Sequence, residues 1–322
     1  MPDIRIGISG WQYDGWRGAF YPPKLPQRHE LAYASRLLNS IEINGTFYSL
    51  KRPGVFEAWR DATPEDFVFA VKGSRYITHT LRLREVDEAL GNFFANGLLK
   101  LGRKLGPILW QLPPRMSWEP SVFKRFCEML PKTAKQAANV ARRHDARVEG
   151  RAWYDTDETR QIRHAFELRD ERMLNADMVR TLRDHGHALV LADAGKYPSA
   201  EDITAGFIYA RLHGAEQMYV SGYSGADLDR WAGRLEQWAH GEQVPQARQI
   251  SQAKPPPRKT RDVFVYFDND VKVHAPFNAL GLAQRLSVSR PLEPVTIAGR
   301  SYPLPPRLKE EQEHEVATAA AR

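Results

Sequence analysis

The sequence predicts an α/β fold, a single (β/α)8 barrel of the TIM type. Short apolar strands alternate with amphipathic helical segments, which is typical of parallel βα units. Eight strand segments occur along the 322 residues, the number that closes a TIM barrel. An open doubly wound sheet would place a glycine-rich turn after its first strand, whereas residues 9–16 of this chain are rich in aromatic side chains.

The predicted strands are short runs of apolar residues, some alternating with polar ones. They are residues 4–9, 40–43, 67–72, 107–112, 164–168, 188–192, 207–211 and 263–267. The predicted helices carry apolar residues at a spacing of three or four, which places them on one face. They are residues 31–38, 55–59, 86–101, 121–130, 176–185, 228–238 and 276–286.

Composition excludes several classes of protein. Hydrophobic residues are 42% and charged residues 26% of the chain, close to globular averages. The longest apolar runs have the length of a strand and fall short of the ~18 residues that a membrane span needs. The first residues have the alternating pattern of a strand and lack the apolar core of a signal peptide. With Cys127 as the one cysteine, no intrachain disulfide can form. We therefore expect a cytoplasmic protein without membrane association, with Cys127 as a buried structural thiol.

The chain divides into a barrel domain over residues 1–290 and a partly flexible C-terminal extension over residues 291–322. The excess of 46 Lys+Arg over 39 Asp+Glu gives a net charge of +7. Part of this excess lies in residues 142–163, and part in a basic, proline-rich segment over residues 243–262, which reads as an exposed loop. Such charge serves solubility, although it leaves nucleic acid as a possible partner.

Polar side chains follow nearly every predicted strand. Because the carboxyl ends of the strands form the mouth of a barrel, we expect these residues to share one site. The candidates for acid–base chemistry are Glu42 and Glu167 as general base, Asp193 as a second carboxylate and His213 as a proton shuttle. The candidates for substrate binding are Trp11, Asn44, Tyr48, Lys72, Arg75, Gln111, Arg169, Arg211 and Asn269. Ser9, Asp268 and Asp270 also follow strands.

The cations Lys72, Arg169 and Arg211 predict an anionic ligand. The Gly/Ser-rich segment over residues 214–225 follows the seventh strand, where many barrels hold a phosphate. Structural ion pairs, such as Glu42 with Lys72 or Glu167 with Arg211, are the alternative interpretation of the same side chains.

Several motifs resemble one family, known as domain of unknown function 72 or YecE-like. They are Gly10-Trp11, Glu42-Ile43-Asn44-Gly45-Thr46-Phe47-Tyr48, Lys72-Gly73-Ser74-Arg75-Tyr76, Gln111-Leu112-Pro113-Pro114, Glu167-Leu168-Arg169, Ala192-Asp193, Arg211-Leu212-His213-Gly214 and Tyr266-Phe267-Asp268-Asn269-Asp270. The resemblance covers residues 4–286 in the family's order. It implies a TIM barrel and no established activity.

We expect an enzyme, a hydrolase, lyase or isomerase, that acts on a phosphorylated or otherwise anionic small molecule. The alternatives are a nucleic-acid-processing barrel like endonuclease IV, a glycosidase, and a non-catalytic binding protein. The strand ends carry few histidines among several cations, so we expect no cofactor and no metal. A glycosidase is disfavoured because Gln111 and Arg211 follow the strands where such barrels place their carboxylates. The sequence leaves the oligomeric state open.

Overall fold

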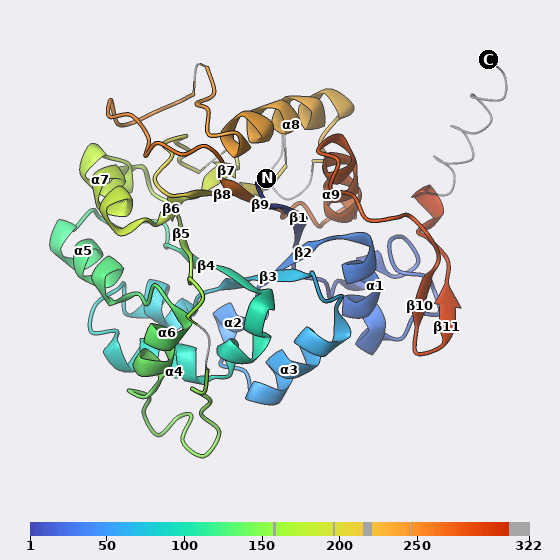
Figure 1. Cartoon of the computed structure of the whole chain (residues 1–322), viewed down its shortest axis with the longest axis horizontal. Helices are drawn as coiled ribbons and strands as arrows, with labels where there is room; N and C mark the ends of the chain where they lie inside the picture. Colours follow the sequence, from blue (N-terminus) through green and yellow to red (C-terminus); the bar gives the residue numbers. More distant parts are fainter. Residues whose placement is uncertain (157–158, 196, 215–220, 246, 309–322) are drawn as a thin grey trace.

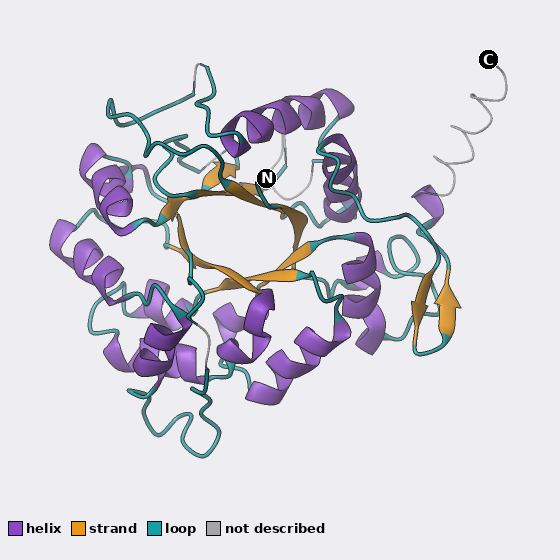
Figure 2. Cartoon of the chain, in the orientation of Figure 1, coloured by secondary structure: helices purple, strands orange, loops and turns teal. Residues whose placement is uncertain are grey.

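The strands form a barrel with the helices outside it (Figures 1 and 2). The computed structural model describes residues 1–156, 159–195, 197–214, 221–245 and 247–308. Its strands are β1 (Ile4–Ser9), β2 (Ser40–Ile43), β3 (Val68–Lys72), β4 (Leu105–Gln111), β5 (His164–Glu167), β6 (Ala188–Leu189), β7 (Leu191–Asp193), β8 (Phe207–Leu212) and β9 (Asp262–Phe267). They are parallel, in the order β6-β5-β4-β3-β2-β1-β9-β8-β7.

The barrel closes through an interrupted strand. Only Val190 separates β6 from β7, and β6 pairs with β5 while β7 pairs with β8. The two pieces are therefore halves of the predicted sixth strand, and the sheet has eight positions around its axis. The predicted TIM-type barrel is confirmed.

The helices differ in detail from the predicted segments. They are α1 (Glu30–Leu37), α2 (Gly45–Tyr48), α3 (Pro53–Ala62), α4 (Asp87–Ala95), α5 (Pro120–Met129), α6 (Ala134–Ala141), α7 (Ala176–His185), α8 (Gly225–Ala239) and α9 (His274–Arg285). The predicted helix over residues 86–101 ends early because Gly97 has φ of 106°, a left-handed conformation that starts a 3-10 segment, Leu98–Lys104. Helices α2 and α6 were not predicted. Between β7 and β8, the described residues form no helix.

Two layers of side chains fill the barrel and set the level of its mouth. The lower layer is a small apolar cluster that includes Ala70, Leu109, Ala165, Tyr209 and Tyr266. Since side chains alternate along a strand, residues two positions further on point inward again. This second layer is polar, and it comprises Ser9, Glu42, Lys72, Gln111, Glu167, Arg211 and Asp268, each at or next to the end of its strand.

The extension after the barrel is partly docked. Strands β10 (Val295–Ile297) and β11 (Arg300–Tyr302) form an antiparallel pair beside α1 (Figure 1), and the Tyr33 hydroxyl of α1 donates to the Pro303 carbonyl at 2.7 Å. Residues 309–322, on which the prediction of flexibility falls, lie outside the described part of the chain. The family-like motifs all lie before this hairpin.

The basic segment over residues 243–262 is not wholly exposed. Arg261 is 1% exposed, and its guanidinium donates to the Pro256 carbonyl at 2.8 Å, whereas Lys254, Arg258 and Lys259 are exposed. Arg261 therefore folds the segment back on itself, and the prediction of a fully exposed loop is wrong for this residue. As predicted, Cys127 is buried, and burial raises the pKa of its thiol. Among the described helices, none is long and apolar enough to cross a membrane.

Candidate functional site

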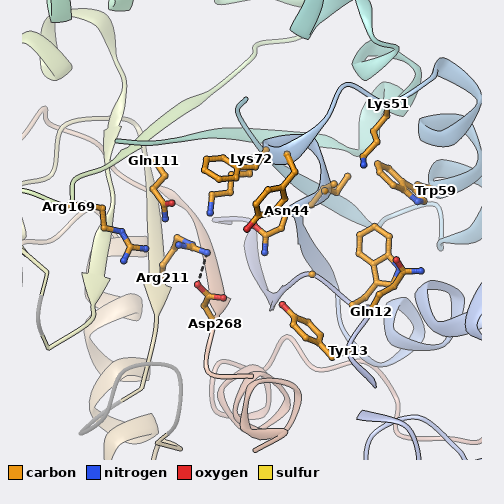
Figure 3. Close-up of a pocket in the computed structure, with 16 residues that line it drawn as sticks. Gln12, Tyr13, Asn44, Lys51, Trp59, Lys72, Gln111, Arg169, Arg211 and Asp268 are labelled. Carbon is orange, nitrogen blue, oxygen red and sulfur yellow. Dashed lines mark hydrogen bonds and ion pairs between the residues drawn. The ribbon is translucent and has the colours of Figure 1, made fainter. Parts of the chain in front are cut away.

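A cavity of about 560 Å³ opens at the carboxyl ends of the strands. Its walls come from the ends of β1, β2, β3, β4, β5, β8 and β9 or the residues that follow them, and from α2 and α3. The lining residues are Gly10, Trp11, Gln12, Tyr13, Ile43, Asn44, Gly45, Phe47, Tyr48, Lys51, Trp59, Lys72, Gln111, Arg169, Arg211 and Asp268 (Figure 3). The cavity thus lies where a TIM barrel carries its chemistry.

Arg211 forms the centre of the polar layer below the cavity. Its guanidinium donates from Nη1 to Glu167 Oε2, and from Nη2 to Glu42 Oε1 and Asp268 Oδ2, each at 2.9 Å. A further bond runs from Nη2 to Ser9 Oγ at 3.0 Å. Arg211 is 0% exposed, so three carboxylates surround one buried cation. The predicted role of Arg211 in holding a ligand anion is not supported by this geometry, because its charge is already matched within the protein.

Glu167 accepts hydrogen bonds on both of its oxygens. Oε2 accepts from Arg211 and, at 2.6 Å, from Gln111 Nε2, while Oε1 lies 2.7 Å from Arg169 Nη2 and 3.1 Å from His213 Nε2. Burial alone would raise the pKa of Glu167, but Arg211, Arg169 and His213 outweigh it and hold the pKa well below its usual range. Glu167 is 0% exposed and does not line the cavity, so it is not available as the predicted general base.

Glu42 is enclosed in the same way. Ser9 Oγ donates to its Oε1 at 2.7 Å and the Tyr209 hydroxyl to its Oε2 at 2.6 Å, in addition to the bond from Arg211. It is 0% exposed and is absent from the cavity wall. Glu42 therefore links residues of neighbouring strands in the polar layer. For Glu42 and Glu167, the predicted alternative of structural ion pairing fits this geometry better than the predicted role of general base. The predicted pair of Glu42 with Lys72 is not formed; Arg211 takes that place.

Among the described residues, Asp268 is the carboxylate that lines the cavity. Its Oδ2 contacts Arg211 and lies 3.1 Å from His213 Nδ1, and its side chain is 16% exposed. Burial raises its pKa, but Arg211 and His213 lower it further, to about 2. His213 thus links Asp268 to Glu167 through its two ring nitrogens and is itself buried beneath the cavity.

Asp270 has the opposite behaviour. Burial, followed by the nearby charge of Asp268, raises its pKa to about 8. A hydrogen bond with Tyr13 opposes this shift only in part. Two carboxyl groups of one loop therefore differ in charge at neutral pH, with Asp268 ionised and Asp270 largely protonated.

Three cations face the cavity beside this layer. Lys72 ends β3, Arg169 follows β5, and Lys51 lies between α2 and α3. Arg169 contacts Glu167 and packs its guanidinium 3.7 Å from the centre of the Tyr197 ring, while Lys51 donates to Ser49 Oγ at 2.9 Å. Burial, and then repulsion by Arg211, lowers the pKa of Lys72.

The cavity has a polar end and an aromatic end. In Figure 3, Arg169, Gln111, Lys72, Arg211 and Asp268 lie on one side, and Trp59 and Gln12 on the other, with Asn44 between them. Trp11 and Trp59 contact edge to face, with ring centres 5.3 Å apart. Asn44 Oδ1 is buried without a hydrogen-bond partner among the described residues, so a ligand can use it as an acceptor.

Other predicted site residues lie elsewhere. Asp193 points outward from β7, where its Oδ2 accepts from the Tyr223 hydroxyl at 3.0 Å and from Trp231 Nε1 at 3.3 Å. Arg75 is exposed and does not line the cavity, and the Asn269 amide is buried against the Ser221 carbonyl. Asp193, the predicted second carboxylate, thus lies away from the cavity, and Asp268 lines it.

The described part of the predicted phosphate loop is also engaged internally. Residues 215–220 lie outside the described part of the chain. Beyond them, Ser224 and Asp227 cap α8 reciprocally, and the Gly214 amide donates to the Tyr223 hydroxyl at 3.1 Å. These groups do not line the cavity. The first amides of α8 are thus partly satisfied by the protein itself.

Of the predicted residues, the structure places Trp11, Asn44, Tyr48, Lys72, Gln111, Arg169 and Arg211 in one cavity wall. The prediction missed Lys51 and Trp59 because neither follows a strand. Trp59 lies on the apolar face of α3, a position typical of a core residue, and only packing shows that its ring reaches the cavity. In the described residues, no three His, Cys, Asp or Glu side chains are arranged to hold a metal ion.

Comparison with known proteins places these observations in a family. The model of a family described as "Protein of unknown function DUF72" matches residues 5–298. The UPF0759 protein YecE of Escherichia coli K12 is 32% identical over 110 residues, which cover 34% of this chain and 38% of that protein. The matched stretch is thus well under half of that relative.

Two solved structures share the fold. A DUF72 family protein of Thermotoga maritima has a TM-score of 0.65 at 22% identity, covering 88% of this chain and 99% of that one. Another from Enterococcus faecalis has a TM-score of 0.62 at 17% identity, covering 91% and 99%. At these identities the likeness concerns the fold alone.

Proposed function

The chain belongs to the DUF72 family of proteins of unknown function, and we propose that it is an enzyme that binds a small organic anion in the cavity at the barrel mouth. The observation that carries the proposal is the charge of the cavity wall. Among the described residues, four cations line the cavity, Lys51, Lys72, Arg169 and Arg211, against one carboxylate, Asp268. A low-dielectric wall with this excess of positive charge attracts an anion.

The volume of the cavity fits a small molecule rather than a polymer. Its volume of about 560 Å³ lies within the range of sites for metabolite-sized ligands. The anionic group would lie near Lys72 and Arg169, and the remaining part of the molecule near Trp11 and Trp59. Asn44 Oδ1 would accept a hydrogen bond from the ligand between these two ends.

The acid–base chemistry differs from the one that the sequence predicts. Glu42 and Glu167 are enclosed by their partners, so the proposed proton-transfer group is Asp268, with His213 behind it at 3.1 Å. A carboxylate with a pKa of about 2 is a weak base. A bound anion next to Asp268 would raise its pKa and make it more effective.

A thermal-shift screen tests the proposal. The panel contains phosphorylated metabolites, dicarboxylates and 2-oxo acids, with neutral sugars and short single-stranded DNA as comparison classes. A ligand at about 100 times its Kd stabilises the folded state by about 2.7 kcal/mol. We expect stabilisation by at least one small anion. Stabilisation by DNA alone would favour the nucleic-acid alternative, and no shift with any anion would overturn the proposal.

A matched pair of variants locates the site. Lys51→Gln removes a charge from the cavity wall, and we expect the affinity for the anion to fall about fivefold, the equivalent of about 1 kcal/mol. Lys124→Gln removes a charge from the 64% exposed side chain on α5 and should leave the affinity unchanged. Equal effects of both variants would show that general charge, and not this cavity, attracts the ligand.

A further inference from the structure

Lys72 occupies an unusual position in the polar layer. It is the last residue of β3, and its side chain is only 8% exposed although it lines the cavity (Figure 3). The backbone at this point is fixed, because Thr46 Oγ1 of α2 donates to the Lys72 carbonyl at 2.6 Å. A Cβ on the next residue, Gly73, would lie 2.3 Å from the ring of Trp110, so the chain must turn closely over that ring.

Within the described part of the chain, Lys72 forms no ion pair with the three carboxylates of the polar layer, each of which contacts Arg211 instead. Among the described residues, Glu42 contacts Arg211, Glu167 contacts Arg211, Arg169 and His213, and Asp268 contacts Arg211 and His213. These lists account for the three carboxylates of the layer.

The contact that Lys72 Nζ does make is with the face of the Phe47 ring, 4.5 Å from its centre. A cation over an aromatic ring offsets only part of the desolvation cost of a buried ammonium. Burial and the charge of Arg211 lower the pKa of Lys72 by more than Glu42, Glu167 and Asp268 raise it, so this amine is easier to deprotonate than a surface lysine.

We propose that Lys72 is a nucleophile that forms a Schiff base with the carbonyl group of an anionic aldehyde or ketone bound in the cavity. The proposal rests on the proposed function, since it requires the cavity to bind the anionic part of the substrate. Arg169, at the same end of the cavity as Lys72, would hold that part, which leaves the Lys72 amine for the carbonyl carbon. The cation that reacts is thus distinct from the cation that binds.

The step is balanced without a further reactant. The ammonium first gives up one proton, and the lone pair of Nζ attacks the carbonyl carbon, so that a C–N bond forms and the carbonyl π electrons move to oxygen. The oxygen takes up the released proton and the amine loses another, which gives a neutral carbinolamine. That second proton returns to the hydroxyl group, the C–O bond breaks, and water leaves a protonated imine. Asp268, on the same cavity wall, carries the protons between nitrogen and oxygen.

The imine makes the cavity suitable for a particular class of reactions. Its positive nitrogen withdraws electrons from the neighbouring carbon, so a C–H or C–C bond next to the former carbonyl can break. Reactions of this class include aldol cleavage, decarboxylation and isomerisation of oxo compounds. The aromatic rings of Phe47, Trp11 and Trp59 contribute to the same cavity wall.

Borohydride trapping tests the proposal directly. The wild-type protein is incubated with pyruvate and, separately, with dihydroxyacetone phosphate, then reduced with sodium borohydride and analysed by peptide mass spectrometry. We expect an adduct on Lys72 in the wild type and in Lys124→Arg, an exposed lysine of α5 outside the cavity, and its loss in Lys72→Arg and Lys72→Met. An adduct that persists in both Lys72 variants would overturn the proposal.

A second measurement does not depend on the choice of substrate. The rate of labelling by trinitrobenzenesulfonate, an anionic aromatic reagent for neutral amines, is followed for Lys72 and Lys51 from pH 6 to pH 10. We expect the labelling of Lys72 to reach half its maximum at a lower pH than that of Lys51. The same or a higher midpoint for Lys72 would refute the proposed nucleophile.

A purely structural role for Lys72 predicts a different result. If the ammonium balanced the buried carboxylates, Lys72→Met would destabilise the fold strongly. Since Lys72 makes no ion pair in the described structure, we expect Lys72→Met to keep the wild-type melting temperature or raise it. If anions raise the melting temperature but no adduct forms and Lys72 is not labelled at a lower pH than Lys51, the anion site is supported and the Schiff base is refuted. If anions do not raise the melting temperature and no adduct forms, both proposals are refuted.

Discussion

The buried cluster around Arg211 leads to a quantitative prediction about stability. Arg211→Met removes the guanidinium but keeps a side chain of similar length. Glu167 would retain Arg169 and His213, and Asp268 would retain His213. Glu42 would retain only the hydroxyl groups of Ser9 and Tyr209, at 2.7 and 2.6 Å. Of the three carboxylates, Glu42 is therefore the one whose remaining partners are hydroxyl groups alone.

The expected magnitude follows from this count. Breaking a buried ion pair from one side costs about 3–5 kcal/mol, because a charge remains in a medium that solvates it poorly. Since one carboxylate is left with hydroxyl partners alone, we expect Arg211→Met to lower the free energy of unfolding by about this amount. Arg180→Met serves as the control, because its side chain on α7 is 68% exposed and its pair with Asp177 contributes at most about 1 kcal/mol.

Urea denaturation at pH 7, followed by circular dichroism and tryptophan fluorescence, measures both variants. The double variant Arg211→Met with Glu42→Gln removes the remaining charge, so we expect it to recover more than half of the lost stability. Two results would refute the reasoning. One is a loss below about 1 kcal/mol for Arg211→Met, within the range of a surface pair. The other is a double variant no more stable than the single one.

Two further predictions concern pH and packing. Asp270 keeps its proton in the folded state up to a pKa of about 8, whereas in the unfolded chain it loses the proton near pH 4, so stability falls between these values as pH rises. Asp270→Asn cannot lose a proton here, so its free energy of unfolding should rise relative to the wild type by up to about 1.4 kcal/mol per pH unit. A difference between variant and wild type that is equal at pH 5 and pH 8 in urea denaturation would contradict the raised pKa of Asp270. Gly7 lies where a Cβ would be 2.0 Å from the Ser40 carbonyl oxygen, so Gly7→Ala should destabilise the barrel by at least about 1–3 kcal/mol. Gly233→Ala on α8, with no atom within 4 Å of the added Cβ, should stabilise the fold by about 0.5–1 kcal/mol. If the melting temperatures of Gly7→Ala and Gly233→Ala shifted in the same direction, the close contact at Gly7 would be contradicted.

Much of the candidate site was predictable because a TIM barrel brings distant strand ends together. Lys72, Gln111, Arg169 and Arg211 are far apart in sequence, yet each follows or ends a strand, and the closed sheet places all four at one cavity. This inference needs only the strand count and the parallel topology. Lys51 and Trp59 could not be found in this way, since loop and helix residues reach a site through packing that no local pattern encodes.

The sequence by itself determined the barrel and the chemical types of the residues at its mouth, because these follow from hydrophobic periodicity and element order. The tertiary structure decided which of these residues are available. Residues 188–192 are apolar throughout, as expected for a strand buried on both faces, so their alternation does not tell whether Asp193 points inward. Only the register around the closed barrel turns Asp193 outward and Asp268 into the cavity. The same register encloses Glu42 and Glu167 around Arg211. It also leaves the Lys72 amine facing the cavity.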